Sequence, residues 1–180
     1  DAGFVTALLG AGAPLLRIVA RGEPLAAQQE SGLTENSALP SQIRLQSALR
    51  RDLVISGGAA SDRDGRAVFS GDPKAIWAVN GATGSASGKP LFTAKQGQPV
   101  VLTITNQTRF PQPVHLHGHA FRLLHALDDG WEPYWLDTTI VPEGRMIRIA
   151  FVADNPGRWM IGSSVLERLD TGLWTWFAVT

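Results

Sequence analysis

The sequence predicts an all-β domain over most of its length, preceded by a stray strand and a linker. From residue 50 onward, short apolar runs alternate with turn residues at the spacing of roughly 8–12 residues that is typical of β-sandwiches and barrels. Two of these runs, residues 101–105 and 145–151, alternate apolar and polar side chains, so each has one face for a core and one for water. A chain of 180 residues with 44% hydrophobic content is long enough to bury one such core.

Residues 1–20 and 21–45 are expected to lie outside that domain. The first segment ends in the apolar run 15–20, which predicts one strand without a core of its own. The second segment is rich in Gly, Pro, Gln, Ser and Asn and has no periodicity, which is typical of a linker or extended loop. The predicted domain therefore covers residues 46–180.

Each strand predicted in this domain is an apolar run bounded by Gly, Pro, Asn or Asp. Long helices are not indicated, although residues 43–53 are also compatible with a short one. The predicted strands are residues 53–55, 67–69, 76–79, 100–105, 120–127, 135–141, 146–152 and 174–179.

Charge and cysteine content exclude several classes of function. The chain carries 16 basic and 16 acidic residues, so it lacks the basic surplus that binds nucleic acid or an anionic membrane. It has no cysteine, which excludes disulfides, iron–sulfur clusters and any blue-copper centre, since that centre needs a Cys thiolate. The most apolar stretch, residues 4–16, is too short to span a bilayer. The chain begins with Asp1, which we interpret as processing or as a cut from a longer protein.

Three of the four histidines lie together in residues 113–119. Side chains two apart on a strand point to the same face, so His115 and His117 can present two imidazoles to one metal ion. Two ligands are half of a site, and the alternative is a pair of hydrogen-bonded structural histidines. Cupins also use His-x-His, but they follow it with a Glu ligand that residues 118–122 do not offer.

The surroundings of this pair closely resemble one family. Residues 111–121, Pro-Gln-Pro-Val-His-Leu-His-Gly-His-Ala-Phe, are similar to the third copper motif of multicopper oxidases, His-Pro-x-His-Leu-His-Gly-His-x-Phe. Residues 136–144 resemble the family's Asp-Thr-x-x-Val-Pro-Pro-Gly, residues 155–159 its Asn-Pro-Gly-x-Trp, and residues 77–81 its Trp-x-Ile-Asn-Gly. The resemblance covers about residues 45–180 and implies a cupredoxin-like Greek-key β-sandwich, the C-terminal domain of the family.

This chain departs from the family at the copper ligands. Position by position, the resemblance assigns type 1 copper to Gln112, Ser163 and Arg168, with the axial place at Leu173. An amide, a hydroxyl and a permanent cation without a lone pair thus replace two imidazoles and a thiolate. A blue-copper site is therefore not expected.

The trinuclear copper site is also expected to be short of ligands. In the family this domain supplies two His-x-His pairs, which correspond to His115 with His117 and to Gly162 with Ser164. The matching pairs of the family's first domain lie outside this chain. His115 and His117 are therefore the only metal ligands that we assign, and we assign no catalytic residue.

The resemblance predicts the C-terminal domain of a multicopper oxidase-like protein that transfers no electrons by itself. The alternatives are a copper-binding oxidoreductase domain that works with a first cupredoxin domain, and a metal-free periplasmic interaction scaffold, similar to the periplasmic cell-division protein that has this fold without copper. The expected cofactor is copper, held weakly at His115 and His117, or none. The expected partners are preceding cupredoxin domains or a partner chain. Residues 1–20 then form the terminal strand of a preceding cupredoxin domain, or a strand that joins copies of this chain, and the expected location is periplasmic or secreted.

A few residues outside the copper motifs also bear on function. Residues 106–108, Asn-Gln-Thr, are a glycosylation sequence if a eukaryote secretes the protein. His119 and His125 match no ligand of the family, and we interpret both as structural. Trp131 and Trp135 lie in a loop-like stretch and are the tryptophans best suited to an exposed binding surface.

Overall fold

The structure, a computed structural model, describes residues 4–9, 12–19, 21–22, 36–58, 60–61, 67–68, 72–84, 88–125 and 130–180. It is built almost entirely of strands, which confirms the predicted all-β class. The chain divides into two compact units, residues 1–36 and 37–180. The finer division into strand, linker and domain stays a prediction. Over the part of the chain that is described, no helix is long and apolar enough to cross a membrane.

The first unit holds a β-hairpin where the sequence predicted one strand. β1 (Phe4–Leu9) pairs antiparallel with β2 (Ala13–Val19), and β2 contains most of the predicted apolar run. Gly12 precedes β2 with φ at 130°, in the region that favours glycine, so it allows the chain to reverse there. Leu16 and Ile18 of β2 are exposed.

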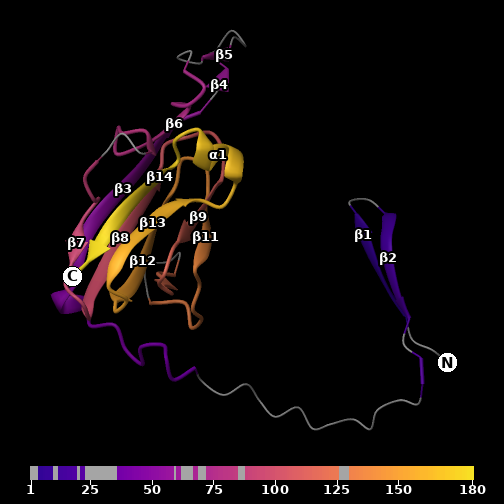
Figure 1. The fold of residues 1–180 in the computed structure, drawn as a ribbon, viewed down its shortest axis with the longest axis horizontal. Helices are drawn as coiled ribbons and strands as arrows, with labels where there is room; N and C mark the ends of the chain where they lie inside the picture. Colours follow the sequence, from indigo (N-terminus) through magenta and orange to yellow (C-terminus); the bar gives the residue numbers. More distant parts are fainter. Residues whose placement is uncertain are drawn as a thin grey trace. The chain divides into compact units, whose positions relative to one another are not determined.

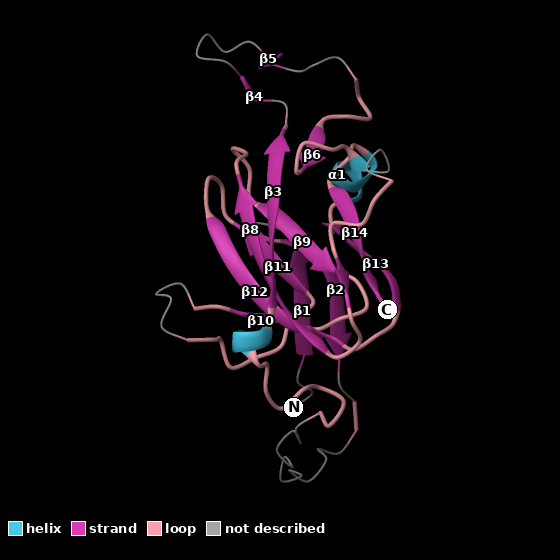
Figure 2. Cartoon of the chain, turned by 90° about the vertical axis from the view of Figure 1, so that its left-hand side faces the viewer, coloured by secondary structure: helices cyan, strands magenta, loops and turns pink. Residues whose placement is uncertain are grey.

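The second unit is a sandwich of two five-stranded sheets, with orders β10-β12-β8-β3-β6 and β11-β9-β13-β14-β7 (Figures 1 and 2). Neighbouring strands are antiparallel, except that β3 with β8 and β14 with β7 run parallel. From β8 to β13 the chain alternates between the sheets, as in a Greek-key sandwich. The first sheet contains β3 (Leu49–Gly57), β6 (Trp77–Val79), β8 (Gln98–Asn106), β10 (Arg122–Leu123) and β12 (Met146–Ala153). The second contains β7 (Thr93–Ala94), β9 (Gln112–Leu116), β11 (Thr138–Val141), β13 (Gly157–Ser163) and β14 (Trp174–Val179).

Some elements differ from the predictions in length or place. The run at 67–69 contributes only β5 (Ala67–Val68), which pairs with β4 (Ala60–Ser61) in a separate two-stranded sheet. The helix alternative at 43–53 is limited to a 3₁₀ turn, η1 (Leu45–Ser47), because β3 begins two residues later. The run at 120–127 gives only the short β10, and its last two residues lie outside the described part.

The two runs with alternating side chains form the centre of the first sheet, as β8 and β12. Leu102 and Ile104 of β8 and Phe151 of β12 face the other sheet and are fully buried. Phe177 of β14 meets them from the opposite side, 5.7 Å from Phe151 between ring centroids. The same alternation in β9 buries Gln112, Val114 and Leu116, so the residues between them face outward. The core therefore determines which face of β9 carries the histidines.

Candidate functional site

His115 and His117 lie side by side on the outer face of the second sheet, as the sequence predicted for two residues of one strand. Their ring centroids are 4.4 Å apart and the rings meet edge to face at 78°. Thr138, directly opposite His115 on β11, has its Oγ1 2.7 Å from Nδ1 of His115. The Asp137 carboxylate lies 3.8 Å from the same nitrogen. Because Thr138 engages Nδ1, it orients Nε2 of His115 as the nitrogen for an external ligand.

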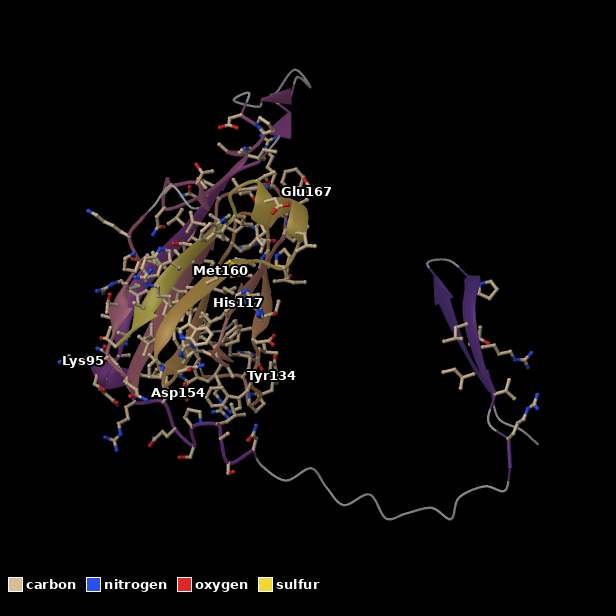
Figure 3. The ribbon with its side chains drawn as sticks, in the orientation of Figure 1. Lys95, His117, Tyr134, Asp154, Met160 and Glu167 are labelled. Atoms are coloured by element: carbon tan, nitrogen blue, oxygen red, sulfur yellow. The ribbon has the colours of Figure 1, made fainter. Side chains whose placement is uncertain are left out.

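His117 follows the end of β9 and is tied to β13. Its backbone N–H donates to the carbonyl oxygen of Met160 at 3.0 Å, and Figure 3 shows the two residues close together. Burial, and then the neighbouring His115, lower the pKa of His117 below its usual value. Both causes favour the neutral imidazole, which is the form that binds a metal ion.

His119 is a core histidine and does not join this pair. Its ring packs among Phe151, Trp159 and Phe177, with centroid distances of 5.4, 5.6 and 5.3 Å. Its Nδ1 donates to the carbonyl oxygen of His117 at 3.3 Å, while Nε2 has no hydrogen-bond partner among the described residues. Burial lowers the pKa of His119, against smaller raising effects of that carbonyl and of Asp154.

His125 lies elsewhere, beside Glu132, at 3.8 Å from its carboxylate. Within the described residues, no group of three or more His, Asp or Glu side chains is placed to hold a metal ion. His115 and His117 are therefore a two-imidazole arrangement in the part of the chain that the structure describes.

The four residues at the type 1 copper positions come together, as the resemblance implied. Gln112 is fully buried at the start of β9, and its Oε1 accepts a hydrogen bond from Nη1 of Arg168 at 2.8 Å. Arg168 belongs to α1 (Leu166–Asp170), and its backbone oxygen accepts from the N–H of Leu173 at 2.8 Å. The oxygen of Leu173 in turn accepts from the N–H of Ser163 at 2.9 Å.

These four residues are chemically unsuited to copper. The Ser163 hydroxyl accepts from the N–H of Val165 at 3.1 Å, and the buried Leu173 offers no donor atom. Gln112 is a neutral amide, and the Arg168 guanidinium is a cation without a lone pair. A type 1 copper ion needs a thiolate and imidazoles at these places. The residues present therefore do not fit that copper ion.

The position of the family's second His-x-His pair differs in sequence and also lacks space for a side chain at its first residue. Gly162 lies opposite His115 in the pairing of β13 with β9. A Cβ atom on Gly162 would lie 2.8 Å from Cβ of Trp174 and 2.9 Å from Cδ1 of Leu169. Both distances are shorter than real Cβ contacts, so the present packing has no room for a side chain there.

Other predicted features take different places in the structure. Asn106 of the glycosylation sequence is fully buried, and its amide nitrogen donates to the carbonyl oxygens of Phe110, Val141 and Pro142. That amide is a structural group in the fold. Trp131 and Trp135 are half-buried, and the guanidinium of Arg122 lies over the ring of Trp135 at 5.3 Å.

The most informative contact, between Gln112 and Arg168, was not predicted. The aligned motifs placed both residues near the type 1 position, but no local pattern indicates that a glutamine and an arginine 56 residues apart bond to each other. Thr138 was also missed, although it lies in a segment that resembles the family. Its pairing with His115 depends on the register of β11 against β9.

Fold and site together define a cupredoxin domain of the multicopper oxidase type. The sequence model of the family described as multicopper oxidase matches residues 61–180, and the chain belongs to this family. Multicopper oxidase MmcO of Mycobacterium tuberculosis is 39% identical to it over 85 residues, which are 47% of this chain and 16% of that protein. A laccase of Arthroderma benhamiae is 31% identical over 93 residues, 46% of this chain and 14% of the laccase.

Solved structures agree with the fold. A multicopper oxidase of Campylobacter jejuni, described as a metallo-oxidase, superposes with a TM-score of 0.67 at 16% identity, over 99% of this chain and 41% of that one. A multi-copper oxidase of Pseudomonas thermotolerans gives 0.64 at 23% identity, over 93% of this chain and 38% of that one. These likenesses confirm the predicted cupredoxin-like sandwich. The chain spans less than half the length of these relatives.

Proposed function

We propose that this chain is the C-terminal cupredoxin domain of a multicopper oxidase-like protein, without type 1 copper and without electron transfer of its own. The observation that carries the proposal is the hydrogen bond between Gln112 and Arg168, because two family ligand positions are bonded to each other there. In the family, electrons enter at type 1 copper and pass through its Cys ligand. Ser163 at that place has no thiolate and no redox chemistry.

We further propose that His115 and His117 are the last copper ligands of the domain. The pair faces outward, Thr138 orients one ring, and the neutral form of His117 is favoured. Two imidazoles on one strand hold Cu(II) only modestly, but copper heads the Irving–Williams order among the divalent metals. The binding is therefore weak and selective for copper.

Two wider roles fit a domain without type 1 copper, and they differ in whether His115 and His117 hold copper. In the first, a preceding cupredoxin domain supplies further histidines to His115 and His117, and the pair contributes to a shared copper site. In the second, the domain is a metal-free scaffold that binds a partner chain. The outward, oriented His115 favours the first role, and the closed position at Gly162 favours the second. In either role we propose a periplasmic or secreted location and no nucleic-acid partner.

The purified full chain, incubated with Cu(II), is expected to lack the intense blue absorption of a copper–thiolate bond and to leave a laccase substrate unoxidised. The reason is that the type 1 positions offer no thiolate. The measurement is a visible spectrum and the rate of oxidation against free copper at equal concentration. Intense blue absorption beyond that of free copper, or turnover above that of free copper, would contradict the proposal.

Isothermal titration with Cu(II) tests the residual site. The wild type is expected to show one weak binding event, which is lost when His115→Ala and His117→Ala are combined. The matched control is His125→Ala, since His125 lies beside Glu132 away from this pair and its loss should leave the isotherm unchanged. Equal isotherms for the wild type and the double variant would show that the pair binds no copper.

A further inference from the structure

A continuous polar path crosses the sandwich at the former type 1 position. It starts in the first sheet at Asn106, the last residue of β8, whose Oδ1 accepts from Oγ1 of Thr108 at 2.7 Å. The Thr108 oxygen accepts from Nε2 of Gln112, on β9 of the second sheet, at 2.9 Å. Oε1 of Gln112 accepts from Arg168 of α1 at 2.8 Å. A chain of hydrogen bonds thus joins side chains from both sheets and from the helix.

The path returns to the first sheet through Arg168. Its Cζ lies 5.5 Å from the ring centroid of Trp77, on β6, in cation–π geometry. Its Nη1 also donates to the carbonyl oxygen of Pro111 at 2.6 Å. In Figures 1 and 2, α1 and β6 lie at the same end of the sandwich. The guanidinium therefore bridges the residue just before β9, β9 itself and β6.

The partners of Arg168 resemble the partners of a bound cation. Two neutral oxygens, of Gln112 and Pro111, and one aromatic face surround a single positive charge. A planar guanidinium with several fixed donors can hold such groups in a defined geometry, as a metal ion does with its ligands. A copper ion in the same place would meet this charge at close range and would be repelled.

We infer that the Arg168 guanidinium has taken over the structural place of type 1 copper and cross-links β9, α1 and β6 without metal. This inference deepens the proposed function, since it states what the changed ligand positions do in this chain. The cross-link makes the folded state of the domain independent of copper and excludes a copper ion from the former type 1 position. Arg168 is thus a structural cation that bonds to another of the former ligand positions, Gln112.

A double-variant cycle on the full chain tests this cross-link. The variants are Arg168→Met, Gln112→Leu and both together, with thermal unfolding followed in excess EDTA. Arg168→Met leaves the fully buried Oε1 of Gln112 without its donor, and Gln112→Leu removes one acceptor of Arg168 and the donor to Thr108. Each change is therefore expected to lower Tm by roughly 3–8 °C. The double variant replaces both partners by apolar groups and is expected to lower Tm no more than the worse single variant does.

The matched control is Arg158→Met. Arg158 also lies over a tryptophan, Trp176, at 5.2 Å, so its loss removes the same charge and a similar aromatic contact. Among the described residues, no glutamine bonds to Arg158 as Gln112 does to Arg168. The Tm of Arg158→Met is therefore expected to fall by less than about 2 °C.

The outcomes separate the cross-link from the proposed function. Additive losses in the two single variants, or an Arg168→Met loss no larger than that of Arg158→Met, would overturn the cross-link. So would a wild-type Tm that falls when EDTA is added. If Arg168→Met does not fold, a folded double variant supports the cross-link, and a double variant that also fails to fold counts against it. A blue or oxidising wild-type sample instead overturns the proposed function.

Discussion

Replacing Asn106 by alanine is expected to destabilise the domain by about 4 kcal/mol, the largest loss that we expect from one side chain. Asn106 is fully buried, and its amide nitrogen donates to three carbonyl oxygens, at 2.7, 3.0 and 3.0 Å. Its oxygen accepts from both the backbone N–H and the hydroxyl of Thr108, at 2.9 and 2.7 Å. The variant leaves these groups without their partner, and the hydrogen bonds to Val141 and Thr108 among them are buried.

The measurement is the free energy of unfolding in urea, compared with Asn155→Ala. Asn155 is exposed, and its amide donates only to the carbonyl oxygen of Gly118, at 3.2 Å, so its loss is expected to cost less than about 1 kcal/mol. Similar losses in the two variants would show that the Asn106 network contributes no more than a surface hydrogen bond.

Gly118→Ala is expected to cost about 3 kcal/mol, from backbone strain and overpacking together. Gly118 has φ at 73°, which alanine adopts only with strain. A Cβ there would lie 2.3 Å from Cε3 of Trp159. Trp159 cannot easily move aside, because its Nε1 donates to the carbonyl oxygen of Asn155 at 2.8 Å and its ring packs against His119.

Urea unfolding of Gly144→Ala separates the two causes. Gly144 has a similar φ of 62°, but a Cβ there meets no atom within 4 Å, so the variant is expected to cost about 1 kcal/mol. Equal costs at the two positions would mean that the contact with Trp159 relaxes freely.

Gly118→Ala is also expected to weaken Cu(II) binding, because this glycine lies between the turn at His117 and the buried His119.

The parts of the fold that the sequence predicted are those with a local signal. β8 and β12 were predicted because each has one face toward the core and one toward solvent, which gives an alternating sequence pattern. β13 was not predicted, since its residues from Gly157 to Ser163 contain two glycines and no clean alternation. β1 was missed for a different reason, because the prediction assigned only the apolar run in β2 to a strand.

The candidate site was predicted in position but not in bonding. The family motifs identified Gln112, Ser163 and Arg168 from their places in the sequence, and of these Gln112 and Arg168 bond to each other. Which atoms bond is decided by side-chain packing between distant elements, and a sequence pattern carries no information on it. Thr138 illustrates the same limit, since its contact with His115 follows from strand register.

The tight packing at Gly162 makes the order of substitutions matter when a histidine is introduced there. With Leu169 and Trp174 both within 3 Å of the missing Cβ, a histidine restored at that position alone meets a steric cost before it gains any ligand role. Relief requires prior changes in neighbours that have no contact with copper. A histidine ligand at this position therefore takes several coordinated changes rather than one.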